Sequence, residues 1–443
     1  MDKCIIKNRS LAGLIFLSAS IFLSGCSVDR RVSRAVEKKI GRSKILSRHY
    51  VGVALYSIEN KKLVLDHNAG KYFTPASNTK LFTFYAGLKM IPDRVPSLRY
   101  IEKGDSLIFW GTGDPSLLQT KLKGNAAYDF LKQSNKQLFF AAGRYTGNFY
   151  GGGWQWDDYN DYYQAEINEL PLMDNLVNVS NKNGETVVFP SLFKDSLRID
   201  SSERDTSYRI RRDFNGNVFR HPPLAIPPGY NEQVPYKVST ATTIALLADT
   251  LKKAVNSITM AMPAEAKTVY GLKTDSVLKE MMLPSDNFIA EQLLLVYSDR
   301  LGQELNAVKA IGHIKKNYLS ALPDKPMWAD GSGLSRYNLF TPRDIIKLLE
   351  LIYIEVHDQQ RLFSLLPAGG KTGTLKNAYP KTDRPFVFGK TGSLSNIYNQ
   401  SGYILTKKGR KYIFSFMNNN FVDATADVRK AMAEIITYIH EKY

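Results

Sequence analysis

A serine and a lysine three residues apart, Ser77 and Lys80, could supply a nucleophile and its base at the start of an apolar segment. Apolar residues recur there at helical spacing, at Leu81, Phe84, Tyr85 and Leu88. Residues three apart on a helix share one face, so the hydroxyl and the amine can meet. A lysine that loses its proton on burial can activate a serine hydroxyl, which is otherwise a poor nucleophile. The stretch predicts a helix within a core, with Ser77 at its opening.

The Ser-x-x-Lys spacing is not specific by itself. It also occurs at Ser191 to Lys194 and at Ser276 to Lys279. A serine at this place is also a common helix N-cap, followed by a solvated lysine one turn later. Other motifs must therefore decide between the two roles of Ser77.

A second motif, Ser285-Asp286-Asn287, follows a proline and opens a long amphipathic segment. It is the only Ser-x-Asn in the chain. Ser285 is well suited to cap the helix. Alternatively, its hydroxyl relays a proton while the amide of Asn287 holds a substrate amide.

The tripeptide Lys-Thr-Gly occurs at residues 371–373, after a Pro-Ala-Gly-Gly turn signal, and again at 390–392, after an apolar run. We interpret the second copy as an edge strand beside the active site. There Lys390 supplies a charge for a substrate carboxylate, Thr391 a hydroxyl, and Gly392 permits close backbone approach.

In this order, the three motifs form the signature of penicillin-recognising serine acyl enzymes. The long interval between Ser77 and Ser285, with a large β-type insert, resembles the low-molecular-mass class C penicillin-binding proteins, the D-alanyl-D-alanine carboxypeptidase/endopeptidase family. Other stretches look like that family at residues 113–117, 154–158, 285–293, 330–336 and 373–377. The resemblance covers nearly the whole chain after the N-terminal segment.

The resemblance implies that Ser77 is acylated, that Lys80 is its base, and that Ser285 passes a proton to the departing D-alanine. Substrate contacts are expected at Asn287, Lys390, Thr391, Gly392 and Ser393. The backbone N–H groups of Ser77 and Ser393 could form an oxyanion hole.

Two further residues, Asp158 and Arg336, match positions that help relatives bind the diaminopimelate side chain of the stem peptide. Ser395 stands where many relatives have glutamine. A capping or turn role is the alternative for Asp158.

The predicted fold is an α/β (α+β) serine transpeptidase/β-lactamase-like domain with a large, mainly β inserted lobe. Strands are expected in a hairpin at 51–65 and near the C-terminus at 384–389, 397–406 and 412–418, before a closing helix at 424–441. Helices are expected at 240–255, 286–301, 303–319 and 341–355. The terminal strands should share one sheet. Residues 26–99 and 241–443 are assigned to the acyl-enzyme domain, and residues 100–240 to the insert.

The first residues predict export. A basic start, an apolar run at 11–23 and Leu-Ser-Gly-Cys describe a bacterial lipoprotein signal at 1–25, with Cys26 as the lipidated residue. A plain signal peptide or an uncleaved anchor is the alternative. The protein is then expected in the periplasm on a membrane, where the basic segment 30–48 contacts anionic headgroups or forms a solvated helix face.

Charge and composition limit the partners. The net charge is +17, and removal of Lys3, Lys7, Arg9 and Asp2 with the signal leaves +15. Export argues against a nucleic-acid partner, and the family resemblance implies peptidoglycan muropeptides and β-lactam antibiotics as partners. The six histidines are scattered without His-Glu-x-x-His, so neither a metal nor a cofactor is expected. A β-lactamase or esterase on the same scaffold, or a non-catalytic cell-wall lipoprotein, are the alternatives.

Overall fold

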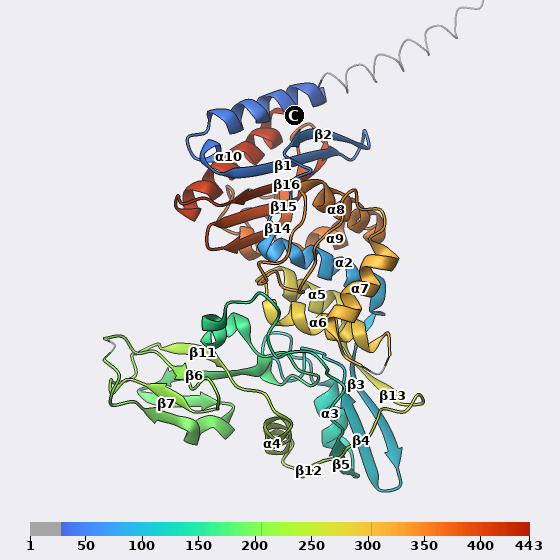
Figure 1. The fold of residues 1–443 in the computed structure, drawn as a ribbon, viewed down its shortest axis with the longest axis vertical. Helices are drawn as coiled ribbons and strands as arrows, with labels where there is room; N and C mark the ends of the chain where they lie inside the picture. Colours follow the sequence, from blue (N-terminus) through green and yellow to red (C-terminus); the bar gives the residue numbers. More distant parts are fainter. Residues whose placement is uncertain (1–27, 205, 303) are drawn as a thin grey trace, which may run out of the picture.

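A computed structural model describes residues 28–204, 206–302 and 304–443. The chain forms an upper body, which holds both ends of the described chain, and a lower part with a lobe to one side (Figure 1). The proposed signal at 1–25 and Cys26 lie outside the described residues.

The body is built on a five-stranded antiparallel sheet with the order β14-β15-β16-β1-β2. Its strands are β1 (Tyr50–Ser57), β2 (Lys62–His67), β14 (Val387–Leu394), β15 (Ile397–Leu405) and β16 (Lys411–Asn419). β1 pairs with β16 along its whole length, so strands from both ends of the chain share the sheet, as predicted.

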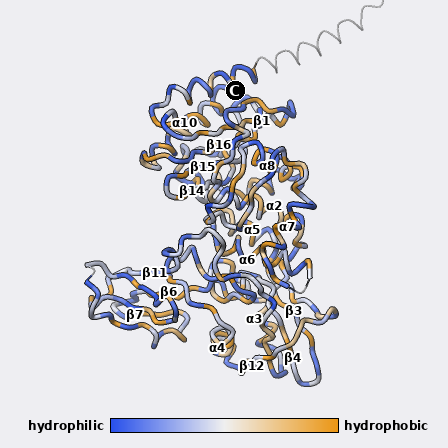
Figure 2. The backbone as a smooth tube through the Cα atoms, viewed as in Figure 1, coloured by the Kyte–Doolittle hydropathy of each residue, from blue (hydrophilic) through white to orange (hydrophobic). Residues whose placement is uncertain are grey.

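Helices cover both faces of this sheet because successive strand residues point to opposite sides. In β1, Val51, Val53 and Leu55 join a cluster with the helix at 28–42 and with α10 (Thr425–Lys442), whereas Ala54 joins the cluster on the other face. The outer helix at 28–42 is largely hydrophilic (Figure 2). No helix in the described part of the chain is both long enough and apolar enough to cross a membrane.

Two helices run through the core of the body. α2 (Lys80–Met90) follows the 3₁₀ turn η2 (Ala76–Thr79), and residues 78–87 are all buried. α6 (Asn287–Asp299) is buried from residue 288 to residue 299. Burial on all sides fixes both helices, so the residues at their N-termini are held rigidly. The predicted core helix after Ser77 is confirmed.

The remaining helices of the body pack around these two, and the cluster that joins them also contains Phe340, Leu349 and Ile352. They are α5 (Thr274–Met282), α7 (Ala307–Tyr318), α8 (Pro342–Val356) and α9 (Gln359–Ser364). Of these four, α7 and α8 match predicted helical segments to within a few residues, whereas α5 and α9 were not predicted.

The inserted part contains a second five-stranded sheet with the order β12-β5-β4-β3-β13. Its strands are β3 (Arg94–Lys103), β4 (Ser106–Gly111), β5 (Gln137–Phe140), β12 (Val255–Ser257) and β13 (Lys267–Lys273). β3 and β13 pair with each other, so the chain enters and leaves the insert side by side. The insert therefore spans residues 94–273 in the structure, which is wider than the predicted 100–240.

Two small sheets complete the insert, β11-β6-β7 and β8-β10-β9. Their strands are β6 (Leu176–Lys182), β7 (Glu185–Phe189), β8 (Leu197–Ile199), β9 (Arg211–Arg212), β10 (Phe219–His221) and β11 (Asn231–Pro235). The helices α3 (Ala126–Gln133) and α4 (Thr240–Leu251) belong here too. Leu246 and Leu251 of α4 pack in one cluster with Phe109 of β4 and Val177 of β6. This shared core explains why α4 belongs to the insert.

Candidate active site

The side chains of Ser77 and Lys80 meet as their spacing predicts. Lys80 Nζ lies 3.0 Å from Ser77 Oγ and also donates to Asn287 Oδ1 at 2.6 Å and to the Ser332 carbonyl at 2.7 Å. Three donated bonds use all three protons of the ammonium form. On losing one proton, Lys80 can keep the other two bonds and offer its lone pair to the Ser77 hydroxyl.

Burial favours that deprotonated form. Lys80 is fully buried, and this desolvation lowers its pKa to about 8, against the opposing charges of Asp286, Asp330 and Glu291. A lysine with this pKa is neutral in a sizeable fraction of molecules near neutral pH. The other two Ser-x-x-Lys pairs lie on the surface, where Ser191, Lys194, Ser276 and Lys279 are all exposed.

At the N-terminus of α6, the cap is Asp286 and not Ser285. The Asp286 carboxylate accepts from Ile289 N, whereas Ser285 lies in the left-handed region with φ 67°. Such a conformation is costly for a non-glycine residue and is common at functional sites. Ser285 Oγ accepts a hydrogen bond of 2.7 Å from Lys390 Nζ. The alternative role of Ser285 as an N-cap is therefore wrong.

Asn287 connects the second motif to the nucleophile. Its Oδ1 accepts from Lys80, and its Nδ2 donates to the Tyr163 carbonyl at 3.2 Å. These partners fix the orientation of the amide, and Nδ2 still has one proton for a substrate carbonyl.

Lys390 and Thr391 lie on β14, at the edge of the central sheet. Lys390 is completely buried and donates to Ser285 Oγ and to the Thr391 carbonyl, both at 2.7 Å. Burial, together with the nearby Lys80, lowers its pKa well below the ordinary value. Thr391 Oγ1 hydrogen-bonds to Thr374 Oγ1 at 2.8 Å.

The first Lys-Thr-Gly copy does not reach the site. Lys371 is exposed in a turn, and Thr372 Oγ1 accepts from Ala368 N. The residue directly after this copy, Thr374, makes the contact with Thr391. The predicted turn at 371–373 thus lies next to the second copy and contacts it through Thr374.

Gly392 allows β14 to pack against the turn that carries Ser77. A Cβ at this position would lie 2.4 Å from the Pro75 carbonyl oxygen and 3.0 Å from Ser77 N. Ser393 follows at the exposed end of the strand and lines the same cavity as Ser77. The strand and the turn thus lie in contact, as the predicted edge strand requires.

Asparagines that the sequence analysis missed hold this turn to the sheet. Asn78 Nδ2 donates to Ser401 Oγ at 2.9 Å, and Asn419 Oδ1 accepts from Thr74 N at 2.7 Å. Asn399 Nδ2 donates to the Thr74 carbonyl at 2.9 Å. β15 and β16 therefore position Ser77 through side chains that no local motif indicates.

Two buried carboxylates, Glu291 and Asp330, lie close enough to Lys80 to act on its charge. The sequence motifs did not indicate this role. Glu291 accepts from the backbone N–H groups of Gly331 and Ser332, at 3.0 and 2.7 Å. Asp330 accepts from Gly333 N and Asn338 Nδ2. Burial and the proximity of Asp330 raise the pKa of Glu291. These bonds fix the loop whose carbonyl at Ser332 holds Lys80.

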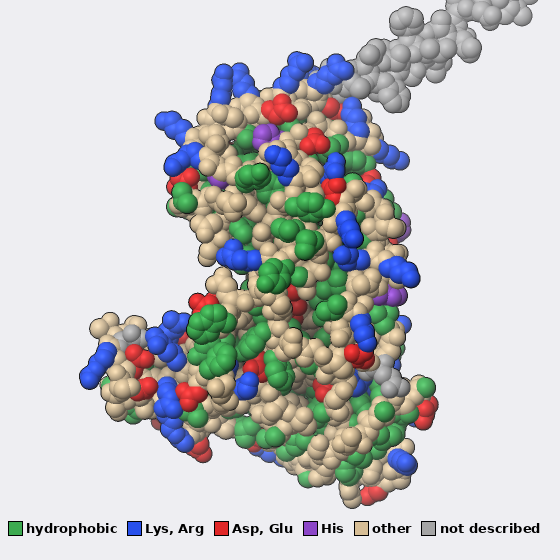
Figure 3. All heavy atoms as spheres, in the orientation of Figure 1, with side chains coloured by type: hydrophobic (Ala, Val, Ile, Leu, Met, Phe, Trp, Pro, Cys, Tyr) green, Lys and Arg blue, Asp and Glu red, His purple; other side chains and the backbone are tan. Residues whose placement is uncertain are grey.

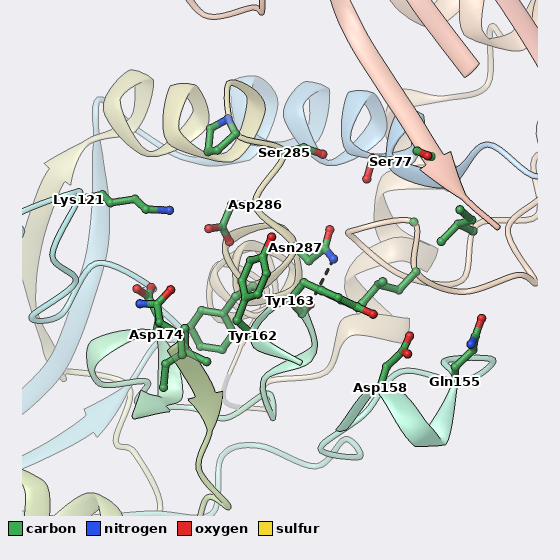
Figure 4. A pocket seen from close by; sticks show the side chains of 18 of the residues that line it. Ser77, Lys121, Gln155, Asp158, Tyr162, Tyr163, Asp174, Ser285, Asp286 and Asn287 are labelled. Carbon is green, nitrogen blue, oxygen red and sulfur yellow. Dashed lines mark hydrogen bonds between the residues drawn. The ribbon is translucent and has the colours of Figure 1, made fainter. Parts of the chain in front are cut away.

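A cavity of about 470 Å³ opens in front of Ser77, between the body and the insert. Asp158 and Gln155 lie at one end, and Asp286, Asp174 and Lys121 at the other (Figure 4).

The predicted side-chain subsite is only partly assembled. Asp158 is half-buried and lines the cavity, and burial raises its pKa while the charge of Arg336 opposes this shift. Arg336 is exposed, and its Nη2 lies 3.5 Å from Gln155 Oε1. Ser395 lines the cavity at the end of β14.

Within residues 28–204, 206–302 and 304–443, no group of three or more His, Cys, Asp or Glu residues could hold a metal ion. The groups arranged around Ser77 are a buried amine, a hydroxyl held by a second buried lysine, and an oriented amide. This combination suits covalent acyl transfer through serine.

The fold and the site define a penicillin-recognising serine enzyme. Residues 32–439 match the D-Ala-D-Ala carboxypeptidase 3 (S13) family. The chain belongs to this family and is a serine-type carboxypeptidase of the low-molecular-mass class C penicillin-binding proteins, as the sequence predicted.

Individual relatives match over most of their length. D-alanyl-D-alanine carboxypeptidase DacB of Haemophilus influenzae is 23% identical over 438 residues, which cover 89% of this chain and 90% of the relative. Penicillin-sensitive carboxypeptidase A of Dictyostelium discoideum is 24% identical over 426 residues, or 82% and 81% of the two chains.

Solved structures show the same fold. Penicillin binding protein 4 of Haemophilus influenzae superimposes with a TM-score of 0.71 at 19% identity, over 92% of this chain and 99% of that chain. The same protein complexed with a β-lactam gives a TM-score of 0.66 over the same shares.

Proposed function

We propose that Ser77 is the nucleophile with which this enzyme cleaves the D-alanyl-D-alanine end of peptidoglycan stem peptides through an acyl-enzyme. The contact of 3.0 Å between Ser77 Oγ and the buried Lys80 Nζ carries the assignment. Related enzymes support the substrate, since one is named a D-alanyl-D-alanine carboxypeptidase.

In the first step, Lys80 takes the hydroxyl proton while Ser77 Oγ forms a bond to the carbonyl carbon. The carbonyl oxygen becomes an oxyanion, for which the backbone N–H groups of Ser77 and Ser393 are the proposed donors. Asn287 Nδ2 holds the substrate amide, and Lys390 and Thr391 bind the terminal carboxylate.

In the second step, the C–N bond breaks and Ser285 passes its proton to the departing amine, while the proton that Lys80 took from Ser77 replaces it. Lys390 holds the Ser285 hydroxyl at 2.7 Å, which orients it for this transfer. Water then cleaves the ester and releases Ser77. The leaving group is D-alanine in the carboxypeptidase reaction and a second stem peptide in the endopeptidase reaction.

Intact-mass spectrometry after incubation with penicillin tests the nucleophile. The wild type should gain the mass of the drug, because a strained amide that mimics the substrate is attacked in the same way. Ser77→Ala should gain nothing. Ser191→Ala and Ser276→Ala, the serines of the other two Ser-x-x-Lys pairs, are matched controls and should react normally. An adduct on Ser77→Ala would reject the assignment.

We also propose that Cys26 carries a lipid that holds the enzyme on a bacterial membrane, facing the periplasm. The Leu-Ser-Gly-Cys sequence supports this, as does the helix at 28–42. Six basic residues of this helix are exposed, at Arg30, Arg31, Arg34, Lys38, Lys39 and Arg42. Lys and Arg side chains gather at this end of the molecule, away from the insert (Figure 3). Such a face can contact anionic headgroups.

Globomycin, which blocks lipoprotein signal processing, tests the anchor. Treated cells should accumulate an unprocessed precursor, and Cys26→Ala should do the same without the drug. Normal processing together with recovery of the protein in the soluble periplasm would contradict the lipid anchor.

A further inference from the structure

The cavity in front of Ser77 continues onto the insert. A second cavity of about 670 Å³ shares with it the residues Thr120, Asp174, Leu176 and Gln233. The surface of the molecule is hollowed where the lobe of β6, β7 and β11 approaches the body (Figure 3). The two cavities thus form one groove that runs from Ser285 over Asp174 onto the β11-β6-β7 sheet.

This small sheet has one buried face and one open face, because its side chains alternate. Val177 and Val179 of β6 and Val234 of β11 are completely buried in the core of the insert. The alternating residues Asn178 and Ser180 line the groove. On this face Asn178 is half-buried and Ser180 is buried, and both side chains border the groove.

The side chains on the open face suit a peptide. Asn178 Nδ2 donates to Asn231 Oδ1 at 2.6 Å, and the remaining donors and acceptors of these two amides and of Gln233 can pair with peptide groups. Val187 and Phe189 of β7, which pair with Ser180 and Asn178, add apolar surface on this face. The groove runs along β6, whose seven residues are long enough for an extended segment of several residues.

The entrance of the groove carries a carboxyl group whose hydrogen bonding is incomplete. Asp174 lies in a turn where Met173, Asp174 and Asn175 all have positive φ, between 55° and 60°. Its Oδ1 is buried and has no hydrogen-bond partner among the described residues. Burial foremost, and then the charge of Asp286, raise its pKa to about 7. A carboxyl group in this state can both donate to and accept from a bound amide.

The groove lies on the leaving-group side of the site. Ser285, the proposed proton donor to the leaving amine, is flanked by Asp286, and Asp286 and Asp174 lie together at this end of the cavity (Figure 4). Asp158, which the acyl half of the substrate would meet, lies at the other end (Figure 4). A single departing D-alanine needs no groove that extends over the sheet.

We propose that the open face of the β11-β6-β7 sheet binds the leaving stem peptide of cross-linked peptidoglycan, with Asp174 and Lys121 at its entrance. This inference rests on the proposed function of Ser77. The amide bond broken and the proton transferred are those of the carboxypeptidase reaction, and only the leaving amine is larger. Lys121 is exposed at the entrance and meets a carboxylate of the leaving peptide.

The test compares two substrates that acylate Ser77 with the same peptide. A monomeric pentapeptide releases D-alanine, and a cross-linked dimer releases a second stem peptide. The double variant Asn178→Ala/Gln233→Ala should lower the ratio of kcat/KM for dimer over pentapeptide by roughly tenfold, as expected for two lost hydrogen bonds. Asp174→Ala should lower the ratio in the same direction. The exposed Asn256 on β12 provides the matched control, and Asn256→Ala should leave the ratio unchanged.

An unchanged ratio in the double variant would refute the proposal that this groove binds the leaving peptide. A wild type that cuts pentapeptide but not dimer would refute it too. Both results leave the function of Ser77 intact. A wild type that cuts neither substrate and forms no penicillin adduct refutes the proposed function and the groove together.

Discussion

Lys80 and Lys390, the two central lysines behind Ser77 and Ser285, are completely buried, whereas at the rim Asp158 is half-buried and Arg336 is exposed. Each central lysine donates at least two hydrogen bonds of 2.7 Å or less. Arg336 makes one contact of 3.5 Å. The difference indicates that packing fixes the acylating groups, while substrate preference depends on weaker contacts at the surface. Substitutions of the buried lysines should therefore have larger effects on the reaction than substitutions at the rim.

The two copies of Lys-Thr-Gly provide the strongest test of this difference. Lys390→Ala should lower penicillin acylation by about a hundredfold or more, since a charged contact is lost from a desolvated site. Lys371→Ala removes the same residue type from an exposed turn and should have little effect. Second-order acylation rates measure both. The reverse ranking would place the wrong copy in the site.

Gly392→Ala tests the contact between β14 and η2. The new Cβ would lie 2.4 Å from the Pro75 carbonyl oxygen, so the strand must move away from Ser77. A displacement of about 1 Å at a reacting group can cost about a hundredfold in rate. Gly216→Ala is the control, because a Cβ there has nothing within 4 Å. Equal acylation rates for the two variants would show that this close approach is unimportant.

The pH profile tests the buried base. The pKa of Lys80 is lowered to about 8, so its neutral form becomes more abundant as the pH rises towards this value. Acylation by penicillin should therefore rise about tenfold per pH unit below pH 8 and level off above it. A rate constant that stays flat between pH 6 and pH 9 would remove Lys80 from this role.

The smallest effect is expected at the rim. If Arg336 and Asp158 bind the diaminopimelate side chain, Arg336→Ala should reduce the preference for diaminopimelate over lysine peptides by no more than about fivefold, because an exposed ion pair contributes about 0.2–1 kcal/mol. Penicillin acylation reports whether the variant remains folded. Equal cleavage of both peptides by the wild type would leave this subsite unassigned.

The sequence predicted the groups at the centre because each motif is local and lies at the start of a helix or within a strand. The helix after Ser77 and the pairing of the terminal strands followed from apolar periodicity. Ser285 could not be separated from Asp286 as the cap, since both residue types cap helices and only the backbone geometry decides.

Other parts of the site depend on distant contacts. Glu291 meets Gly331 and Ser332 across 40 and 41 residues, and Asn419 meets Thr74 across 345. Neither contact leaves a periodic pattern in the sequence. The limits of the insert were missed for the same reason, because β3 and β13 are recognised only by their pairing with each other.

The pairing of β1 with β16 also makes the active site depend on the last part of the chain to fold. The insert, at 94–273, is complete long before β14, β15 and β16 have been made. The turn with Ser77 lacks its strand partners until then, because Asn399, Ser401 and Asn419 come from the last part of the chain. Contacts this far apart in sequence form slowly. A chain whose last strands have not yet folded onto β1 therefore has no assembled site around Ser77.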